Sequence, residues 1–126
     1  MAPHSNRGGD QWARVKRRRR FIRYRTELPL SVRDPLERDY DGRCDVISEG
    51  GLGGTVLFPL PLGSVVHLRF AIPTSPARFD VLAVVRDQRD FEHGFEFVSL
   101  TDSERVAIRQ FCNGLRADSE TGQVDP

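Results

Sequence analysis

The chain has 126 residues, 38% of them hydrophobic and 29% charged, which fits one soluble globular domain with a modest core and some disordered sequence. No stretch approaches the roughly 18 consecutive apolar residues of a membrane-spanning helix, and the N-terminus lacks the apolar segment of a signal peptide, so we expect a cytoplasmic protein without membrane insertion. Cys44 and Cys112 are too few and too far apart for a disulfide framework or a zinc site, and we expect both to be small buried hydrophobic residues.

The first feature along the chain is a basic block from Arg14 to Arg25. Residues 1–16, which include the first residues of the block, are expected to form a flexible N-terminal arm. The block holds eight cationic side chains and no acidic one, whereas the rest of the chain has 11 basic residues against 18 acidic ones. This asymmetry indicates an anionic partner, because arginine can grip a phosphate or a guanine edge with two hydrogen bonds. A solvated basic arm or a nonspecific nucleic-acid anchor is the alternative interpretation of the block alone. The block is interrupted by Phe21, Ile22 and Tyr24, and we expect these side chains to anchor it against the folded body.

Short segments of alternating hydrophobic residues follow the block, and each is predicted to be a β-strand. Short strands separated by turn signals favour an antiparallel barrel or sandwich. The predicted strands span residues 26–33, 43–48, 52–58, 65–72, 79–85 and 93–98.

Details of these segments carry further expectations. Pro29 cannot donate a ladder hydrogen bond, which suggests an edge position in the first strand. Residues 34–41 and 86–90 are charged and turn-rich, and we expect both to be loops. Segment 79–85 is almost continuously apolar, which suggests a strand that is buried on both faces.

The hydrophobic periodicity changes after the last predicted strand. Thr101 and Glu104 have the spacing of a capping box, which marks the start of a helix. These features predict a helix over about 102–115, lying across one end or face of the barrel, and then a disordered tail at 117–126. The helix would bury one apolar stripe, formed by Ile108, Phe111, Cys112 and Leu115.

A second candidate feature lies between two predicted strands, in the stretch Ser48-Glu49-Gly50-Gly51. The two glycines allow a bulky ligand to approach without meeting a Cβ, and Ser48 offers a hydroxyl. The nearby Asp45 could accept hydrogen bonds from a guanine edge. For this pattern alone, a plain hairpin turn is the favoured interpretation.

In this order, the features resemble the PilZ domain, a small bacterial barrel with a C-terminal helix that binds cyclic dimeric GMP (cyclic di-GMP). The first PilZ motif, Arg-x-x-x-Arg, is matched by Arg19 and Arg23. The second motif, Asp/Asn-x-Ser-x-x-Gly, is matched in its last two positions by Ser48 and Gly51. The last strand and the helix start are also similar to those of PilZ domains, and the resemblance covers residues 17–116.

The resemblance implies a mainly β fold, a six-stranded antiparallel β-barrel over residues 17–116 with one C-terminal α-helix. It also implies that arginines contact the phosphates and guanines of cyclic di-GMP while the turn holds the second guanine. No catalytic group, metal site or cofactor is expected, because the three histidines are scattered and no Ser/His/Asp or Cys/His arrangement is supported. The residues expected to contact the ligand are Arg18, Arg19, Arg20, Arg23, Asp45, Ser48, Gly50, Gly51 and Arg86.

One position departs from the PilZ pattern. The acidic position two residues before Ser48 holds Val46, and Asp45 lies three residues before Ser48 instead. Neighbouring residues of a regular strand point to opposite faces, so Asp45 would face away from Ser48 unless a β-bulge restores its direction. The loss of one good bidentate contact costs about 1–3 kcal/mol, which weakens binding without necessarily abolishing it.

The sequence therefore predicts a non-enzymatic cyclic di-GMP receptor that acts as an adaptor for an unidentified downstream protein. Repulsion among eight cations predicts an arginine segment that is mobile until the ligand neutralises it, so that binding changes its order. A degenerate PilZ-type module that works by protein contact without nucleotide, as in pilus assembly, is the second interpretation, and Val46 supports it. An RNA- or DNA-binding protein is a third, less favoured because few exposed aromatic residues are predicted on the strands.

Overall fold

The structure is a computed structural model that describes residues 21–115. The predicted flexible arm at 1–16, the arginines Arg18, Arg19 and Arg20, and the predicted tail at 117–126 lie outside the described residues.

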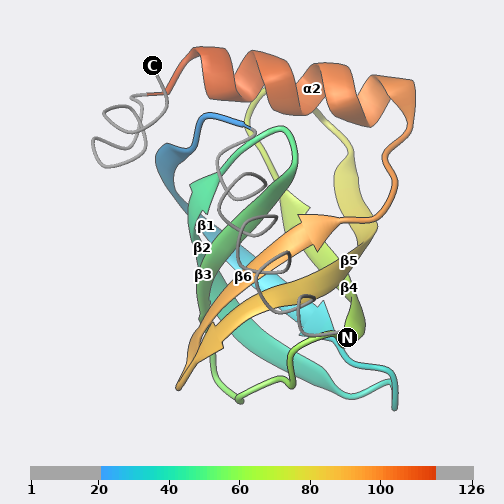
Figure 1. Cartoon of the computed structure of the whole chain (residues 1–126). Coiled ribbons are helices and arrows are strands. Elements are labelled where there is room, and N and C mark those ends of the chain that lie inside the picture. Colours follow the sequence, from blue (N-terminus) through green and yellow to red (C-terminus); the bar gives the residue numbers. More distant parts are fainter. Residues whose placement is uncertain (1–20, 116–126) are drawn as a thin grey trace, which may run out of the picture.

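Six strands form a closed antiparallel barrel in the described part of the chain (Figure 1). Around the barrel the order is β1-β2-β3-β6-β5-β4, and pairing between β1 and β4 closes the ring. Together with the C-terminal helix, this arrangement confirms the predicted fold class. The strands are β1 (Tyr24–Arg33), β2 (Asp39–Ile47), β3 (Gly51–Val56), β4 (Val65–Ala71), β5 (Arg78–Arg89) and β6 (Glu92–Phe97).

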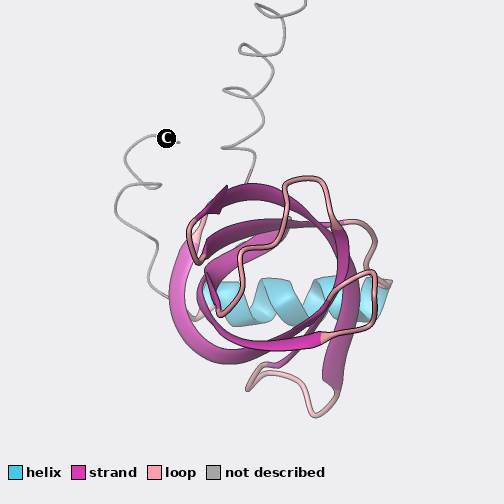
Figure 2. Ribbon diagram, turned by 90° about the horizontal axis from the view of Figure 1, so that it is seen from below, coloured by secondary structure: helices cyan, strands magenta, loops and turns pink. Residues whose placement is uncertain are grey.

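The helix α2 (Asp102–Asn113) lies across one end of the barrel (Figures 1 and 2). The predicted capping box is confirmed: the N–H of Glu104 donates to Thr101 Oγ1 at 3.1 Å, and the N–H of Thr101 donates to Glu104 Oε1 at 2.9 Å. No helix within the described range is long and apolar enough to cross a membrane. The helix completes the core with one buried face, formed by Ile108, Phe111 and Cys112.

Alternating residues fill the barrel from the strands. In β4, Val66, Leu68 and Phe70 are at most 1% exposed, whereas His67 and Arg69 between them face solvent. The two cysteines, one on β2 and one on α2, are buried free thiols, as predicted.

Two segments predicted as loops are partly strand. β2 begins at Asp39, so the last three residues of the predicted loop 34–41 pair with β1. β5 continues to Arg89, and the predicted turn at 86–90 is therefore strand over most of its length, with a bulge at Arg86 where the register with β6 shifts. Charged residues are compatible with these strands because the outer surface of an antiparallel barrel faces water.

The prediction that segment 79–85 is buried on both faces is wrong. Phe79, Val81 and Ala83 point into the core and are at most 3% exposed. Leu82, between them, is 37% exposed, and Val84 is partly exposed on the same outer side. The outer face of β5 is therefore apolar but open to solvent in the described part of the chain.

Pro29 was expected at a sheet edge, and it lies in β1 of the closed barrel at a position with one paired neighbour. It pairs with Arg43 of β2 on one side. On the other side, the pairing of β1 with β4 covers only Ser31 to Arg33. The missing N–H of Pro29 is therefore tolerated at a position where β1 has one neighbouring strand instead of two.

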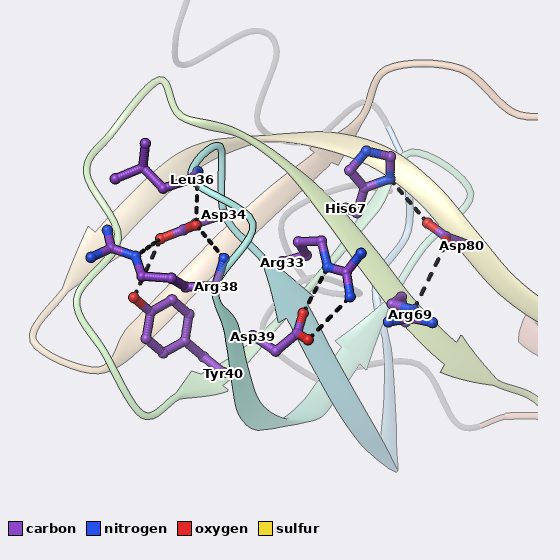
Figure 3. Close-up of polar contacts among 9 residues, drawn as sticks. All are labelled: Arg33, Asp34, Leu36, Arg38, Asp39, Tyr40, His67, Arg69 and Asp80. Carbon is purple, nitrogen blue, oxygen red and sulfur yellow. Dashed lines mark hydrogen bonds and ion pairs between the residues drawn. The ribbon is translucent and has the colours of Figure 1, made fainter.

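The β1–β2 connection at the end opposite α2 is held by the buried carboxylate of Asp34 (Figure 3). Its Oδ1 accepts hydrogen bonds from the N–H groups of Leu36 and Arg38, and its Oδ2 accepts from Arg38 Nε and the Tyr40 hydroxyl. Burial alone would raise the pKa of Asp34, but the hydrogen bonds and charge of Arg38 outweigh it and lower the pKa below its usual range.

The β3–β4 loop at the same end is held by His93, which is 5% exposed. The N–H of Leu60 donates to His93 Nε2 at 2.9 Å, and His93 Nδ1 lies 2.9 Å from the carbonyl oxygen of Phe91, which can only accept. These partners fix a neutral imidazole that carries its proton on Nδ1.

Candidate functional site

The turn between β2 and β3 is a hairpin closed by the side chain of Ser48. The Ser48 N–H donates to the carbonyl oxygen of Gly51 at 2.8 Å, and Ser48 Oγ accepts from the N–H groups of Gly50 at 3.1 Å and Gly51 at 3.2 Å. Ser48 is only 9% exposed. The hydroxyl and the two amides that were expected to face a ligand are thus hydrogen-bonded to one another. Ser48 therefore stabilises the conformation of the turn.

Residues 21–23, called the lead-in segment because they come directly before β1, pack onto this turn through Phe21. A Cβ on Gly50 would come 2.5 Å from Cδ2 of the Phe21 ring, so the absence of a side chain at Gly50 makes room for that ring. Further along, Tyr24 pairs with Ile47, the residue before Ser48. The segment that carries the arginines therefore approaches the barrel at the turn.

Arg23 is the one residue of the basic block that is both expected to contact the ligand and described by the structure. It is partly buried and lies between Phe21, which contacts the turn, and Tyr24, which pairs with β2. Arg18, Arg19 and Arg20 lie outside the described residues. The structure thus brings Arg23 to the same side of the barrel as Ser48.

Asp45 lies at a β-bulge in β2. Cys44 pairs with Gly54 and Val46 pairs with Gly53, so Asp45 is the extra residue between two consecutive partners on β3. The bulge also explains why Cys44 and Ile47, three residues apart, are both fully buried.

The bulge sets the direction of the Asp45 side chain. With Cys44 and Ile47 pointing inward, Asp45 and Val46 both lie on the outer side of the barrel. The Asp45 carboxylate accepts a hydrogen bond from Arg43 Nε at 2.8 Å, and this ion pair is exposed. Asp45 therefore points to the outer surface of the barrel, where its carboxylate is paired with Arg43.

Arg86 is connected to the β2–β3 turn through Glu96. Its Nε donates to Glu96 Oε1 at 2.6 Å, and Glu96 pairs across β6 and β3 with Gly51. Arg86 thus lies two strands away from the turn, with an exposed guanidinium that is held by an acidic partner.

Sequence reasoning missed the contact between the turn and α2. Arg109 Nε donates to Glu49 Oε1 at 3.3 Å, although the two residues are 60 positions apart. Nothing in the sequence pattern signals this pair, because it depends on how α2 crosses the end of the barrel. The turn is therefore held on one side by Phe21 and on the other by the helix.

The site is an open surface of hydrogen-bonding and charged groups. Two open concavities of about 430 and 340 Å³ lie at the β5–β6 hairpin and beside the β1–β2 loop, and neither is lined by a predicted ligand residue. Within residues 21–115, no cluster of three potential metal ligands is present. Burial raises the pKa of Cys44 to about 12 and that of Cys112 to about 11, so neither thiol is an activated nucleophile.

Comparisons with known proteins agree with this geometry. The profile of the PilZ domain family matches residues 17–114 of the chain. Comparison with curated protein sequences gave no match.

Solved structures resemble the fold at low sequence identity. The crystal structure of the PilZ domain of CeSA from a cellulose-synthesizing bacterium has a TM-score of 0.60 at 15% identity, and 73% of this chain and 95% of that chain are covered. The Bacillus subtilis inhibitor of motility (MotI/DgrA) has a TM-score of 0.64 at 18% identity, with 75% of this chain but only 49% of that one covered. The PilZ domain of YcgR from Escherichia coli, solved with c-di-GMP, has a TM-score of 0.62 at 13% identity, with 79% and 92% covered.

Proposed function

The chain belongs to the PilZ domain family, and we propose that it is a cyclic di-GMP receptor. In this proposal, ligand binding changes the order of the N-terminal arginine segment, and the change is read by a protein partner in the cytoplasm. The protein acts by binding, and no residue is assigned a catalytic role.

The observation that carries the proposal is the contact of Phe21 with Gly50. It supports the proposal because Phe21, which lies between the two arginines of the first motif in the sequence, contacts the turn that holds the second motif. Arg19 and Arg23 are separated by four positions, and Phe21 lies midway between them. In this proposal, a ligand that rests against the turn is contacted by Arg23, two residues after Phe21, and by Arg19.

The chemistry of the residues suits a dianionic dinucleotide. Arg19 and Arg23 take guanine edges or phosphates with paired N–H donors, and Arg18 and Arg20 add phosphate contacts or stack on the bases. The turn at Ser48, Gly50 and Gly51 receives the second guanine. Each charge-assisted hydrogen bond contributes about 1.5–3 kcal/mol, so a few such contacts outweigh the loss of one motif residue.

Asp45 supplies the acidic group in this proposal. The bulge turns it to the outer side of the barrel, which Val46 also faces, so a carboxylate is available close to the position where the family motif has one. Asp45 Oδ1 already accepts from Arg43 Nε, and the second carboxylate oxygen can accept from a guanine while that bond persists. The positive charge of Arg43 beside the carboxylate makes it a weaker acceptor than an unpaired one.

A degenerate PilZ-type module that acts by protein contact alone is the second candidate. Val46 favours it, and so does the internal pairing of the Gly50 and Gly51 amides with Ser48 Oγ. A nucleic-acid-binding role for the arginine block is a third candidate, less favoured because few exposed aromatic residues are predicted on the strands to stack on bases.

Isothermal titration with cyclic di-GMP separates these candidates. The proposal expects binding by the full chain, and a loss of at least about tenfold in affinity for each of Arg19→Ala, Arg23→Ala and Ser48→Ala. No heat at tens of micromolar ligand favours the protein-contact module. Tight binding of unrelated oligonucleotides that falls steeply with salt favours the nucleic-acid candidate.

A further inference from the structure

An apolar patch lies on the outside of the barrel, over β4, β5 and the residue that follows β6. Val65 pairs directly with Val84 across β4 and β5, and Val98 is hydrogen-bonded through its N–H to the carbonyl oxygen of Leu82. Val65 is 47% exposed, Leu82 37% and Val98 53%, and Val84 is partly exposed. These four residues, Val65, Leu82, Val84 and Val98, are called the outer patch below.

The outer patch departs from what the solvent face of an antiparallel strand requires. Such a face is normally polar, and the outward positions of β1 and β2 follow that rule with charged side chains such as Arg33 and Arg43. The outward positions of β5 instead include leucine and valine. Leu82 and Val84 therefore form an apolar outer surface that the described chain leaves open to solvent.

We infer that the outer patch is covered by the same patch of a second copy of this chain, in a weak two-fold dimer. At the outer patch, Leu82 and Val84 of β5 have backbone neighbours on both sides, so no free strand edge is available there to extend the sheet. A partner therefore has to pack face to face on the barrel surface. This inference goes beyond the proposed function and does not depend on ligand binding.

The order of residues along β5 identifies a second copy as the partner. The outward residues run Asp80, Leu82, Val84 and Arg86, with an acid at one end of the apolar pair and a base at the other. A two-fold axis between Leu82 and Val84 places Asp80 of one copy opposite Arg86 of the other, and the reverse. In such an interface the same surface of each copy meets the other, with apolar residues against apolar residues and an acid opposite a base.

The charged ends are held in place by ion pairs within each copy. At one end Asp80 binds His67 at 3.0 Å and lies 3.7 Å from Arg69 Nε (Figure 3). At the other end Arg86 is bound to Glu96 at 2.6 Å. Each end of the patch thus carries both positive and negative side chains. Charges of this kind at the edge of an interface determine how the two copies align more than how tightly they bind.

The size of the outer patch sets the strength of the dimer. Four partly exposed aliphatic side chains form a patch on the order of a few hundred Å². Stable complexes bury about 800 Å² on each partner, so a smaller patch supports transient association. We therefore expect a dissociation constant of roughly 10–1,000 μM.

Sedimentation equilibrium of the full chain without ligand, at roughly 10 μM to 1 mM, tests the inference. Val65→Asp is the test variant and Val106→Asp on α2 its matched control, because both valines are 47% exposed. We expect Val65→Asp to raise the dimer dissociation constant at least about tenfold and Val106→Asp to leave it unchanged. Circular dichroism confirms that each variant is folded.

Charge reversal tests the two-fold register separately. Asp80→Arg and Arg86→Asp each place like charges opposite one another and are expected to weaken the dimer, whereas the double variant is expected to restore it. A chain that remains monomeric to 1 mM overturns the inference. So does self-association that Val65→Asp leaves intact, since another surface then forms the contact.

Discussion

The ring of Phe21 lies so close to Gly50 that a Cβ at Gly50 would come 2.5 Å from Phe21 Cδ2. Phe21 is 42% exposed, so this contact positions the lead-in segment on the turn without adding much to the core. The position of Phe21 relative to the turn therefore depends on a glycine at residue 50, and Arg23 follows two residues later.

Gly50→Val is expected to displace Phe21 and to weaken cyclic di-GMP binding at least about tenfold while the barrel stays folded. The reason is steric, because only the side chain of Phe21 lies in the way and that side chain can swing out. Titration calorimetry measures the affinity, and thermal unfolding measures the stability. Gly114→Ala is the control, since its Cβ would meet nothing closer than 3.7 Å. Equal affinities for Gly50→Val and the unaltered chain would contradict the proposed role of Phe21.

Replacement of Arg23 tests whether its guanidinium contacts the ligand. We expect Arg23→Ala to lose about 1–3 kcal/mol of binding free energy and Arg23→Lys to recover only part of it, because lysine keeps the charge but not the planar fork. Arg33→Ala on the same segment of chain is the control, since Arg33 binds Asp39 at 2.9 Å at the far end of β1. Similar losses for the two alanine variants would point to a general charge effect instead of a specific contact.

Val46→Asp is a gain-of-function test of the same site. It restores the acidic residue of the family motif on the outer side of the bulge, and we expect cyclic di-GMP to bind about tenfold tighter or more. Asp45→Ala is expected to weaken binding, and Val46→Asp added to it is expected to rescue the loss. If neither substitution changes the affinity measured by calorimetry, no carboxylate on β2 takes part in binding.

The sequence was sufficient for those parts of the fold that depend on local periodicity. Alternation in β4, where Val66, Leu68 and Phe70 point inward, is visible in the sequence because every second residue is apolar. The helix start at Thr101 and Glu104 was equally readable, since a capping box is a contact between residues three positions apart.

Features that depend on neighbouring strands were not predictable in the same way. The charged end of β5 resembles a turn in the sequence, yet β6 pairs with it up to Arg89. The bulge at Asp45 arises from a register shift against β3, so the sequence alone left the direction of Asp45 open. The Glu49–Arg109 pair joins elements 60 residues apart, and no local pattern can specify it.

Protonation of His93 is expected to destabilise the barrel. Burial lowers the pKa of His93 below its ordinary value of about 6.5, because the charged form is desolvated and would set a proton on Nε2 against the N–H of Leu60. A histidine whose folded pKa is depressed contributes stability above about pH 6.5, and that stability is lost as the pH falls towards the folded value. Urea unfolding between about pH 5 and 8 is expected to show this loss, and His93→Gln is expected to flatten it. A chain whose stability is constant across this window would contradict the assignment.

In the proposed complex, one ligand contacts both the segment before β1 and the β2–β3 turn. A two-dimensional NMR titration of the full chain with cyclic di-GMP examines both contacts at once, because each backbone amide reports separately. The amides of Phe21 to Tyr24 and of Ser48 to Gly51 are expected to shift together and to saturate with one dissociation constant. Shifts confined to only one of these two segments, or none at saturating ligand, would contradict the proposed complex.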